Sequence, residues 1–579
     1  MRWNRLAVGL LFLFCFFPFT YAQTQTPLAI QTQVELYADV ILPDVETLQQ
    51  FSQNFVVDKA TYNNLKGNFT ARTWLPKKKY AEFDTWNLSY VIVHEDNSKY
   101  SVTLATSYND WKSTWDKYPN YTTYLAIMDT FKTKYPQWCT VETVLANTPG
   151  NHKILVAHLG VQNPQVPKPS VLYSSTMHGD EVTGYYLMLR LIDYLLSNAN
   201  TDAQVQNILN NVDLWIVPLI NPDGTYYTSN NTIGTSPTST RSNRAGDDIN
   251  RSFPDMTYSL NGGTPPTQTM PPEVIAMMQF INNHHFVMSA NFHGGAEIYN
   301  YPWDCKTTAQ RPHPDRIWFQ TIGQTFANSC RSNSGQNGYF WDTSTGVIEG
   351  GDWYVIRGSQ QDYANYVAHC KEVTIEVSTN KVPQNNKIAA HWTYTKNALL
   401  NYIEEALFGF NGTVTDMLTG EPLEAKVFIR NYDRDNTDVS SHLPLGDYYR
   451  PINAGTYTVE YSAQGYSSKV ISVNVTNGQT TTRNVRLSKS TNISTPQNDK
   501  FALAPNPARD KITITVAEEL NLAFPIIFKI VDITGKIIET VAVNEAPTVI
   551  STEQLYSGNY FLEMIDNQRI VAVKRFVKH

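Results

Sequence analysis

The sequence predicts an α/β fold for the central part of the chain, residues 113–407, with a small α+β region before it and two β-sandwiches after it. Two observations support this prediction. In the central part, apolar runs typical of buried strands, such as Val171–Ser175 and Val373–Val377, alternate with helix-like segments such as Glu181–Leu196. After residue 407, short strand-like runs alternate with turns, which is typical of antiparallel sandwiches. Helices on both faces of such an α/β sheet leave the carboxyl ends of its strands for ligand binding.

Two further strands of the central sheet are predicted at Leu214–Ile220 and Val287–Phe292, because each is an apolar run. Ahead of the sheet, residues 23–112 alternate short apolar runs with polar breaks, which predicts a small α+β unit. This unit precedes a catalytic region in a chain that carries an export signal. It is therefore either an inhibitory or folding-assisting pro-region or a permanent accessory domain, and both interpretations stay open at this point.

The first 22 residues have the pattern of a signal peptide. Arg2 and Arg5 precede the apolar run Leu6–Phe17, and Thr20–Ala22 offers a cleavage site. The run is too short to span a bilayer comfortably, and no later segment is long and apolar enough to do so. The sequence therefore predicts a secreted mature protein without a membrane span.

Composition excludes some partners and some metal sites. The formal net charge is −7 and no basic patch is present, so nucleic acid is not an expected partner. Four cysteines follow the export signal, at 139, 305, 330 and 370, and in an exported protein they permit two disulfides in any of three pairings. No Cys-x-x-Cys pair occurs, so a cysteine metal site is not expected.

A different metal site is indicated by the segment His178-Gly179-Asp180-Glu181, which lies between a predicted strand and a predicted helix. An imidazole and a carboxylate two residues apart at such a junction can converge on one point. A catalytic zinc takes three protein ligands, and His293 is the candidate for the third because it follows the apolar run Val287–Phe292 directly. The pair His178 and Glu181 alone is a weak signal, since a helix-capping carboxylate beside a surface histidine gives the same pattern.

The surrounding sequence strengthens this interpretation, because five segments between residues 118 and 407 occur in an order shared with a known family. The segments are His178–Glu181, Asn221–Gly224, Arg241–Pro254, Ser289–Asp304 and Trp353–Val377. Together they resemble the zinc carboxypeptidase family, in its branch of carboxypeptidases N, E, D and M. The resemblance implies a mixed-sheet α/β catalytic domain, one Zn²⁺ per catalytic domain, and hydrolysis of the C-terminal peptide bond of peptides and proteins.

The resemblance also implies roles for the charged residues of the site. His178, Glu181 and His293 resemble the zinc ligands of the family. Glu376 resembles the general base, which takes a proton from the zinc-activated water and passes it to the leaving amine. Arg241 resembles the residue that polarises the scissile carbonyl and stabilises the oxyanion.

Three further residues resemble the family's substrate contacts. Asn250 and Arg251 resemble the pair that clamps the terminal carboxylate of the substrate, for which a guanidinium is suited because it can bind a carboxylate through two hydrogen bonds. Tyr354 resembles the mobile tyrosine that closes over bound substrate, whereas the nearby Tyr366 is predicted to be a core aromatic. His284 and His285 precede the strand, so they are predicted to lie at a helix end or on the surface.

Two more positions in the resemblance imply which C-terminal residue of the substrate is preferred. In basic-specific members of the branch, an Asp follows the third zinc ligand by eleven positions and a Gln lines the base of the pocket; Asp304 and Gln361 stand there. A buried carboxylate favours Lys or Arg and disfavours apolar side chains, whereas an Asp304 that merely starts a turn would carry no preference. The chain departs from the branch at Asp180, where Asn is usual, and at Ser252.

The C-terminal part carries two further resemblances. Residues 408–487 resemble the transthyretin-like β-sandwich that follows the peptidase domain in the same branch, and residues 488–500 are polar and predicted to be a linker. Residues 501–579 resemble the C-terminal sorting domain of the type IX secretion system, through Ala504–Ala508, Val531–Lys536 and Ser557–Leu562. This implies the type IX secretion machinery as a partner, and an extracellular or cell-surface location.

The sequence therefore predicts a secreted zinc metallocarboxypeptidase that prefers C-terminal Lys or Arg. Two alternatives remain beside it. One is an amidase or peptidase of other specificity on the same scaffold, which the Arg241–Pro254 segment and the sandwich domain disfavour. The other is a non-catalytic surface binding protein with a decayed site, which the presence of all three candidate ligands and Glu376 disfavours.

Overall fold

The structure is a computed structural model, which describes residues 28, 33–93, 102–160, 165–257, 270–335, 338–490, 500–516, 525–533, 536–566 and 569–579. The predicted export signal and most of the predicted linker lie outside these residues. The chain divides into two compact units. One holds residues 1–415, 422–461 and 470–485, and the other holds residues 416–421, 462–469 and 486–579.

The predicted α/β domain is built on a mixed sheet that has eight strands among the described residues, in the order β13-β12-β14-β11-β9-β10-β8-β7. The strands are β7 (Cys139–Leu145), β8 (Ile154–Leu159), β9 (Ser170–Ser175), β10 (Asp213–Val217), β11 (Met288–His293), β12 (Glu297–Tyr301), β13 (Val347–Glu349) and β14 (Lys371–Val377). The central strands β10, β9, β11 and β14 run parallel, whereas β8 and β12 join them antiparallel. The expected mixed sheet is therefore confirmed.

Alternate side chains of β8, β9 and β10 enter two different cores. In β8, Ile154 and Val156 lie in one core and Leu155 and Ala157 in the other, as expected when successive side chains point to opposite faces. Both faces of the sheet are covered, which explains why its strands appear in the sequence as continuous apolar runs and not as alternating ones.

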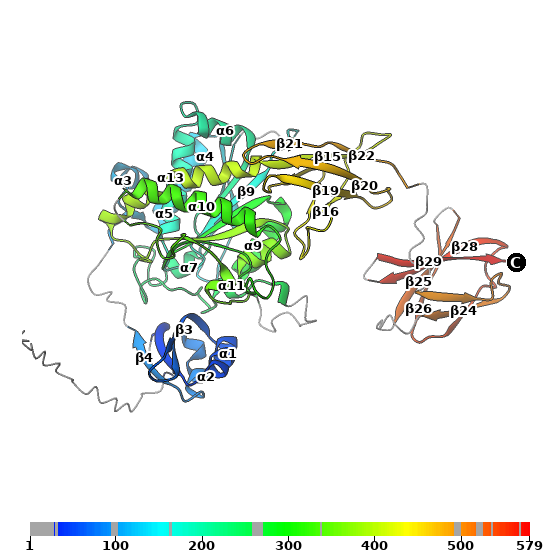
Figure 1. Ribbon diagram of the computed structural model, residues 1–579, viewed down its shortest axis with the longest axis horizontal. Helices are drawn as coiled ribbons and strands as arrows, with labels where there is room; N and C mark the ends of the chain where they lie inside the picture. The colour runs from blue at the N-terminus through cyan, green and yellow to red at the C-terminus, as the bar shows by residue number, and fades with distance from the viewer. Residues whose placement is uncertain are drawn as a thin grey trace, which may run out of the picture. The chain divides into compact units, whose positions relative to one another are not determined.

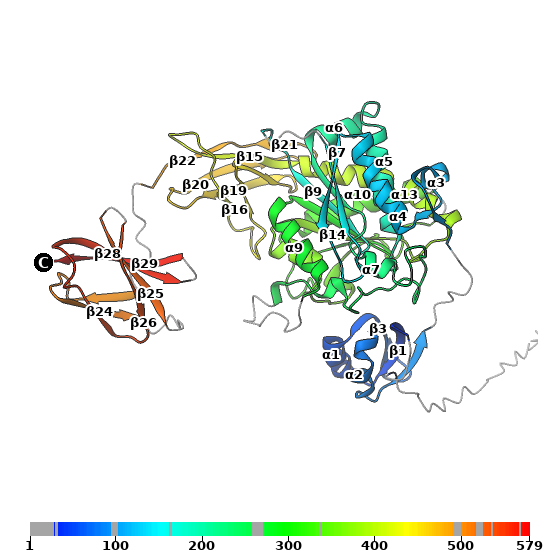
Figure 2. The same cartoon turned by 180° about the vertical axis from the view of Figure 1, so that it is seen from behind.

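Helices cover both faces of the sheet (Figures 1 and 2). The larger core takes side chains from α3 (Tyr108–Thr114), α4 (Tyr121–Lys134), α5 (Thr183–Ser197), α6 (Ala203–Asn211), α10 (Arg316–Ser334) and α13 (Asn385–Glu404). The smaller core takes them from α9 (Pro272–His284), α12 (Gln360–Tyr366) and the short η4 (Ile249–Arg251). In Figure 2, β9 and β14 stand between α9 on one side and α4 and α5 on the other.

Two elements differ at their ends from the predicted ranges. The helix predicted from Glu181 begins at Thr183, so that Glu181 lies in the connection between β9 and α5. The strand predicted to reach Ile220 ends at Val217, because Pro218 has no backbone N–H to donate to a neighbouring strand. After it, the helical turn α7 (Pro222–Thr225) begins.

The predicted α+β unit at the N-terminus is an antiparallel sheet of order β2-β3-β1-β4 with two helices. Its elements are β1 (Glu35–Leu42), α1 (Val45–Asn54), β2 (Val56–Asn63), β3 (Asn68–Pro76), η2 (Lys77–Lys79), α2 (Tyr80–Asp84) and β4 (Ser89–Val93). It has a core of its own, which includes Phe51, Phe55 and Phe83. Trp111, on the N-terminal side of the predicted boundary at 112, packs in the larger core of the central sheet. The two-stranded pair β5 (Leu104–Ala105) and β6 (Tyr118–Pro119) also contributes to that core, through Ala105 and Tyr118.

After η6 (Glu405–Leu407), strands form two small sheets of order β18-β15-β21 and β17-β16-β19-β20. The strands of this region are β15 (Gly409–Asp416), β16 (Lys426–Ile429), β17 (Val439–Ser440), β18 (Asp447–Arg450), β19 (Gly455–Ser462), β20 (Lys469–Val475), β21 (Thr480–Thr482) and β22 (Val485–Leu487). Val427, Tyr448 and Val459 are each buried between more exposed neighbours, which is the alternation of a strand with one face in a core.

The C-terminal region is a second β-structure, with sheets of order β23-β24-β27 and β26-β25-β28-β29. Its strands are β23 (Phe501–Ala504), β24 (Lys511–Val516), β25 (Ile526–Asp532), β26 (Ile537–Val543), β27 (Thr548–Ser551), β28 (Gly558–Asp566) and β29 (Arg569–Lys578). Ile512, Phe528, Leu562 and Phe576 share its core. Among the described residues, no helix is long and apolar enough to cross a bilayer.

The four cysteines that follow the export signal are all buried, and each is a free thiol, so the two disulfides that the sequence permits are not formed between them.

A cluster of buried charges joins β18 to the α/β domain. Arg450 is fully buried, and its guanidinium donates to Asp315 at the start of α10 (2.9 Å) and to Asp433 (2.8 Å). Lys371, the first residue of β14, also pairs with Asp315. Two buried carboxylates are thereby matched by two buried cations.

Removing the Arg450 side chain charge should destabilise this unit strongly. Arg450→Met leaves Asp433 and Asp315 buried without the guanidinium that pairs with both of them. Removing one partner of a buried ion pair lowers the free energy of unfolding by about 3–5 kcal/mol. Arg430→Met is the matched control, because Arg430 pairs with Glu460 on the surface, where the cost is about 0–1 kcal/mol. Urea unfolding followed by fluorescence measures both. Equal effects of the two substitutions would contradict this account.

Candidate metal and peptidase site

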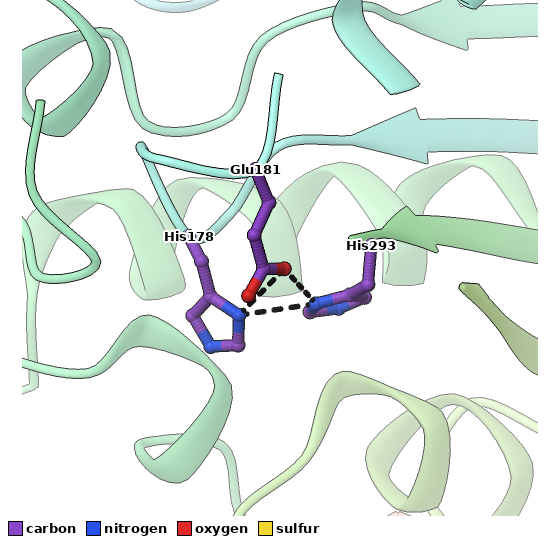
Figure 3. Close-up of side chains that lie close together, drawn as sticks. All are labelled: His178, Glu181 and His293. Carbon is purple, nitrogen blue, oxygen red and sulfur yellow. Dashed lines mark hydrogen bonds and ion pairs between the residues drawn. The ribbon is translucent and has the colours of Figure 1, made fainter. Parts of the chain in front are cut away.

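Three side chains converge beyond the carboxyl ends of the central strands. His178 and Glu181 lie in the connection between β9 and α5, and His293 is the last residue of β11. Glu181 Oε2 lies 3.0 Å from His178 Nδ1 and 2.9 Å from His293 Nδ1, and the two Nδ1 atoms are 3.1 Å apart. Figure 3 shows the three side chains pointing to one another. The structure thus brings together the three predicted ligands.

The cluster fits a zinc ion in its chemistry and its spacing. Two imidazoles and one carboxylate are the ligands of many catalytic zinc sites, and bonds of about 2.0–2.1 Å in a tetrahedron separate the ligand atoms by about 3.3 Å. All three residues are buried, and among the described residues they form the one group of three or more such side chains close enough to share an ion. Three facing acceptor atoms in a buried position need a cation between them.

The charges around the cluster also suit a cation. Burial lowers the pKa of His293 to about 4, so its imidazole is neutral. Burial opposes the ionisation of Glu181, but His178 and Lys381 outweigh it and hold the pKa of Glu181 well below its usual range. Burial and Arg241 oppose protonation of His178, yet Glu181 and Asp248 raise its pKa. The site therefore holds an ionised carboxylate and a neutral imidazole, which are the forms that bind a metal ion.

The connection that carries His178 is held by the Asn221–Gly224 segment. Asn221 Nδ2 donates to the carbonyls of Met177 (3.1 Å) and Arg241 (3.3 Å), and the segment packs so closely that a Cβ on Gly179 would lie 2.3 Å from the backbone of Gly224. The segment Asn221–Gly224 therefore has a structural role here, because it holds the backbone at Met177 and at Arg241.

Asp248 is the site residue to which sequence reasoning gave no role. Its Oδ1 lies 3.2 Å from His178 Nε2, and its Oδ2 accepts from Arg241 Nε at 3.0 Å. A carboxylate behind a metal-binding histidine fixes the orientation of the ring and raises its basicity. The sequence offered one indication of such a role, because Asp248 stands two residues before Asn250 inside the segment Arg241–Pro254.

Arg241 and Glu376 line one cleft beside the cluster. Arg241 is buried, and its Nη1 lies 3.6 Å from Glu181 Oε1. Glu376 is on β14 in register with His293 on β11, and it is 9% exposed, so it is not the exposed strand carboxylate that was the alternative. The cleft has a volume of about 1550 Å³ and is also lined by Glu181 and Tyr354. Tyr354 is half-buried and its ring contacts Trp353.

The candidate clamp residues follow Asp248 directly. Asp248 Oδ1 accepts from the Asn250 N–H at 2.9 Å, and Asn250 Oδ1 accepts from the Gln360 N–H at 2.9 Å. Arg251 is half-buried, and its charge acts on Asp248 and on Asp304. One short segment therefore connects the metal cluster to the start of α12.

The predicted pocket residues contact each other. Gln361 Nε2 donates to Asp304 Oδ1 at 2.9 Å, and Asn300 Nδ2 lies 3.2 Å from the same oxygen. Asp304 is 2% exposed, and burial raises its pKa. A Cβ on Gly350 would lie 1.9 Å from Asp304 Oδ1, so only glycine leaves room for this carboxylate. The structure shows a buried carboxylate in a polar setting and not a turn at the surface.

The other candidates lie elsewhere. The His284 ring contacts the rings of Trp215 and Phe280 at the end of α9, and His285 stacks on His442; neither is part of the cluster. Tyr366 is partly buried against Trp303. The chain's departure at Ser252 leaves a hydroxyl that donates to the Asp248 carbonyl at 2.8 Å.

A mixed α/β sheet with a His-Glu-His cluster at the carboxyl ends of its strands defines a metallohydrolase. Comparison with known proteins identifies the class more closely. A zinc carboxypeptidase family model matches residues 124–398, a carboxypeptidase regulatory-like domain matches residues 409–488, and a secretion system C-terminal sorting domain matches residues 502–579.

Among curated relatives, mouse carboxypeptidase M is 31% identical over 342 residues, which cover 56% of this chain and 70% of that protein. The catalytic chain of rat carboxypeptidase N is 32% identical to this chain, and the match covers 75% of that protein. Human carboxypeptidase D is 31% identical, and the match covers 26% of its length. Carboxypeptidase A of Helicoverpa armigera, a solved structure, is 16% identical with a TM-score of 0.45; the match covers 64% of this chain and 98% of that one.

The chain therefore belongs to the zinc carboxypeptidase family, which hydrolyses peptide bonds at C-termini and uses zinc. Its relatives are carboxypeptidases N, E, D and M, as the sequence predicted. The regulatory-like domain is the predicted transthyretin-like sandwich. The sorting domain implies type IX secretion and an extracellular or cell-surface location.

The contact between Asp248 and His178 leads to a test of metal binding. We expect Asp248→Asn to weaken zinc retention by about 10–100-fold, because the partner that orients the ligand and raises its basicity is lost. Competition with a chromophoric chelator measures the affinity. Asp247→Asn is the matched control, since Asp247 is half-buried and pairs with Lys78. Equal zinc affinity in the two variants would contradict a supporting role for Asp248.

Proposed function

We propose that this protein is a secreted exopeptidase that removes a C-terminal Lys or Arg from peptides and proteins, with one zinc ion and with Glu376 as general base. The observation that supports it best is that the cleft beside the metal cluster is lined by Glu181, Arg241 and Glu376 together. A metal ligand, a guanidinium and a carboxylate in one cleft are the groups that hydrolysis of an amide by activated water requires.

Zinc bound to the cluster would supply a Lewis acid and a water with a pKa near ~7. In this proposal Glu376 accepts a proton from the attacking water and donates it to the leaving amine. The Arg241 guanidinium donates to the carbonyl oxygen as negative charge develops there. Asp248 accepts a hydrogen bond from Arg241 Nε, and Arg241 also lines the cleft.

Recognition of the chain end is assigned to Asn250 and Arg251. Arg251 carries a positive charge near Asp248 and Asp304, and a terminal carboxylate would pair with it. The Lys or Arg preference is assigned to Asp304 with Gln361. Burial raises the pKa of Asp304, so its ionised form is stabilised when a cationic side chain enters beside it. An apolar side chain provides no such charge and leaves the carboxylate unpaired.

The test is a panel of matched peptides that end in Lys, Arg, Phe or Glu, assayed with and without a zinc chelator. We expect release of Lys and Arg alone, abolished by the chelator. Asp304→Asn should lower kcat/KM for Lys and Arg by about 30-fold or more, because losing one member of a buried charge pair costs about 2–5 kcal/mol. Release of Phe by the unaltered protein would contradict the pocket assignment and leave the enzyme class intact.

Two controls separate the parts of this result. Asp342→Asn alters an exposed carboxylate at the same cleft and should leave the preference unchanged. Glu376→Gln should lower kcat by about 10²–10⁴-fold with zinc still bound, as expected for loss of a general base. Full activity of Glu376→Gln would overturn the assignment of the base.

We further propose that the N-terminal α+β region is a pro-region that covers the cleft. Glu35, the first residue of β1, is buried, and its carboxylate accepts from the N–H groups of Arg241 (2.8 Å) and Ser242 (3.3 Å) and from Ser242 Oγ (2.9 Å). Tyr37 Oη accepts from Lys381 Nζ at 2.8 Å, and the Arg241 guanidinium lies 5.7 Å from the Trp74 ring.

The same region contributes to the lining of the cleft through Tyr37, Ala60 and Arg72. Contacts to the residue that would polarise the carbonyl favour the inhibitory interpretation over that of a distant accessory domain. Burial and the neighbouring Asp180 raise the pKa of Glu35 to about 7. Because the pKa of Glu35 is raised in the docked state, protonation of Glu35 favours docking. This contribution is fully present below pH 4.5, the ordinary pKa of the group, and it is lost as the pH rises through about 7.

This proposal is tested with a protease site placed between residues 93 and 102 of the full chain. We expect peptidase activity to rise after cleavage, and the cut region to dissociate more readily at about pH 8 than at about pH 6 because Glu35 ionises. The same chain before cleavage is the control. Equal activity before and after removal of the region would support a permanent accessory domain.

A further inference from the structure

Glu372 is a buried acid that the proposed reaction does not use. It lies on β14, four residues before Glu376, and its side chain is fully buried. Its carboxylate contacts uncharged donors. Ser289 Oγ donates to Oε2 at 2.6 Å, Gln360 Nε2 lies 3.2 Å from both oxygens, and Asn291 Nδ2 lies 3.4 Å from Oε1. Burial raises the pKa of Glu372 to about 7. Several polar side chains therefore converge on one acid that is costly to bury.

The register of the sheet places this acid behind the candidate site. Ser289 on β11 lies opposite Glu372 on β14, and four residues further along each strand His293 lies opposite Glu376. Side chains that are an even number of residues apart on a strand point to the same face. Glu372 therefore lies on the face of β14 that carries the proposed base, and its contacts extend the polar surroundings of the site into the sheet.

Gln360 connects Glu372 to α12. It is the first residue of that helix and is fully buried. An ionised carboxylate only accepts hydrogen bonds, so the Gln360 amide turns Nε2 to Glu372 and, at 3.1 Å, to Ser174 Oγ. Among the described residues, Gln360 Oε1 is then buried without a partner. The backbone N–H of Gln360 donates to Asn250 Oδ1 at 2.9 Å. One residue thus links the buried acid to the candidate clamp.

The bond from Gln360 decides which end of the Asn250 amide can bind a carboxylate. A backbone N–H only donates, so the atom of Asn250 that meets it is the oxygen, and Nδ2 is the end that can donate to a terminal carboxylate. Gln361 is oriented in the same way. Its Oε1 accepts from the Thr374 N–H at 2.7 Å, and its Nε2 donates to Asp304. The start of α12 therefore orients one residue of the proposed clamp and one of the proposed pocket.

From this arrangement we propose that Glu372 is a positioning residue for recognition of the substrate's chain end, and that it acts through Gln360. By holding the Gln360 side chain it fixes the start of α12, and with it the N–H that orients the Asn250 amide. Glu372 itself makes no contact with the substrate in this proposal. The inference rests on the proposed exopeptidase function, and in particular on the assignment of Asn250 to the clamp.

The test measures competitive inhibition of peptide hydrolysis by L-arginine and by agmatine, which is arginine without its carboxylate. The full chain is used, cut between residues 93 and 102 if the uncut chain is inactive. We expect the unaltered protein to bind arginine about tenfold or more tightly than agmatine, because only arginine engages the clamp. Glu372→Leu and Gln360→Met remove the same hydrogen bond from opposite ends. Each should raise the inhibition constant of arginine about tenfold and that of agmatine less than about twofold.

The conservative variant Glu372→Gln should rescue recognition of the carboxylate. Its amide oxygen can accept from Gln360 Nε2 while its nitrogen donates to Ser289 Oγ, so arginine should bind within about twofold of its original strength. Tyr363→Phe is the matched control. It removes a hydrogen bond from α12 to Asn282 (3.0 Å) and leaves Gln360 in place, so neither inhibition constant should change.

The double variant Glu372→Leu with Gln360→Met tests whether one residue acts through the other. It should weaken arginine about tenfold, as each single variant does, because both changes remove one interaction. Multiplied effects of about 100-fold would mean that Glu372 acts by another route, and would overturn the inference. Equal weakening of arginine and agmatine in the single variants would also overturn it, since that is the result of a general loosening of the site.

The remaining outcomes separate this inference from the proposed function. If circular dichroism shows that Glu372→Leu does not fold, Gln360→Met tests the link alone, and unchanged inhibition by arginine would overturn it. If neither the cut nor the uncut protein hydrolyses peptides, or if the unaltered protein binds arginine and agmatine equally, the proposed function or its clamp is wrong and the inference falls with it. A clear preference for arginine that persists in both single variants would remove the inference alone.

Discussion

The parallel pairing of β9, β11 and β14 is the constraint on which the site depends. In register, Phe292 lies opposite Ser175 and His293 lies opposite Glu376, so the three strands end at the same edge of the sheet. This places two predicted metal ligands, the proposed base and the connection that carries Glu181 within one small volume. The larger apolar core fixes this edge, because all three strands pack side chains into it.

Buried charge is the cost of this arrangement, and the surrounding residues are placed to offset it. Glu181, Asp248 and Asp180 bring three carboxylates into a space that excludes most water. Arg241 lies between Glu181 and Asp248, and Lys381 lies between Asp180 and Glu181, so each cation serves two acids. Unpaired charges in such a position are costly, so substitution of any one of these residues is expected to affect its neighbours.

The same principle joins β18 to the α/β domain, without any catalytic purpose. Arg450 lies between Asp315 and Asp433, and Lys371 and the Tyr432 hydroxyl also contact Asp315. These groups come from the start of α10, from β14 and from the sandwich, so their pairing requires all three to be in place. Residues 422–461 and 470–485 of the sandwich accordingly fall in the same compact unit as the peptidase domain.

The sequence by itself predicted the fold class, because buried parallel strands appear as apolar runs, and it predicted the family through five ordered segments. It identified His178, Glu181 and His293, and the structure brings them together. It could not assign Asp248, because a carboxylate among polar residues gains a role only when the fold sets it behind His178. The contacts of Lys381 with Asp180, of Arg450 with Asp315, and of Glu35 with Arg241 were likewise decided by the tertiary structure. Each joins residues more than 100 positions apart, and no local pattern records which distant charges meet when the chain folds.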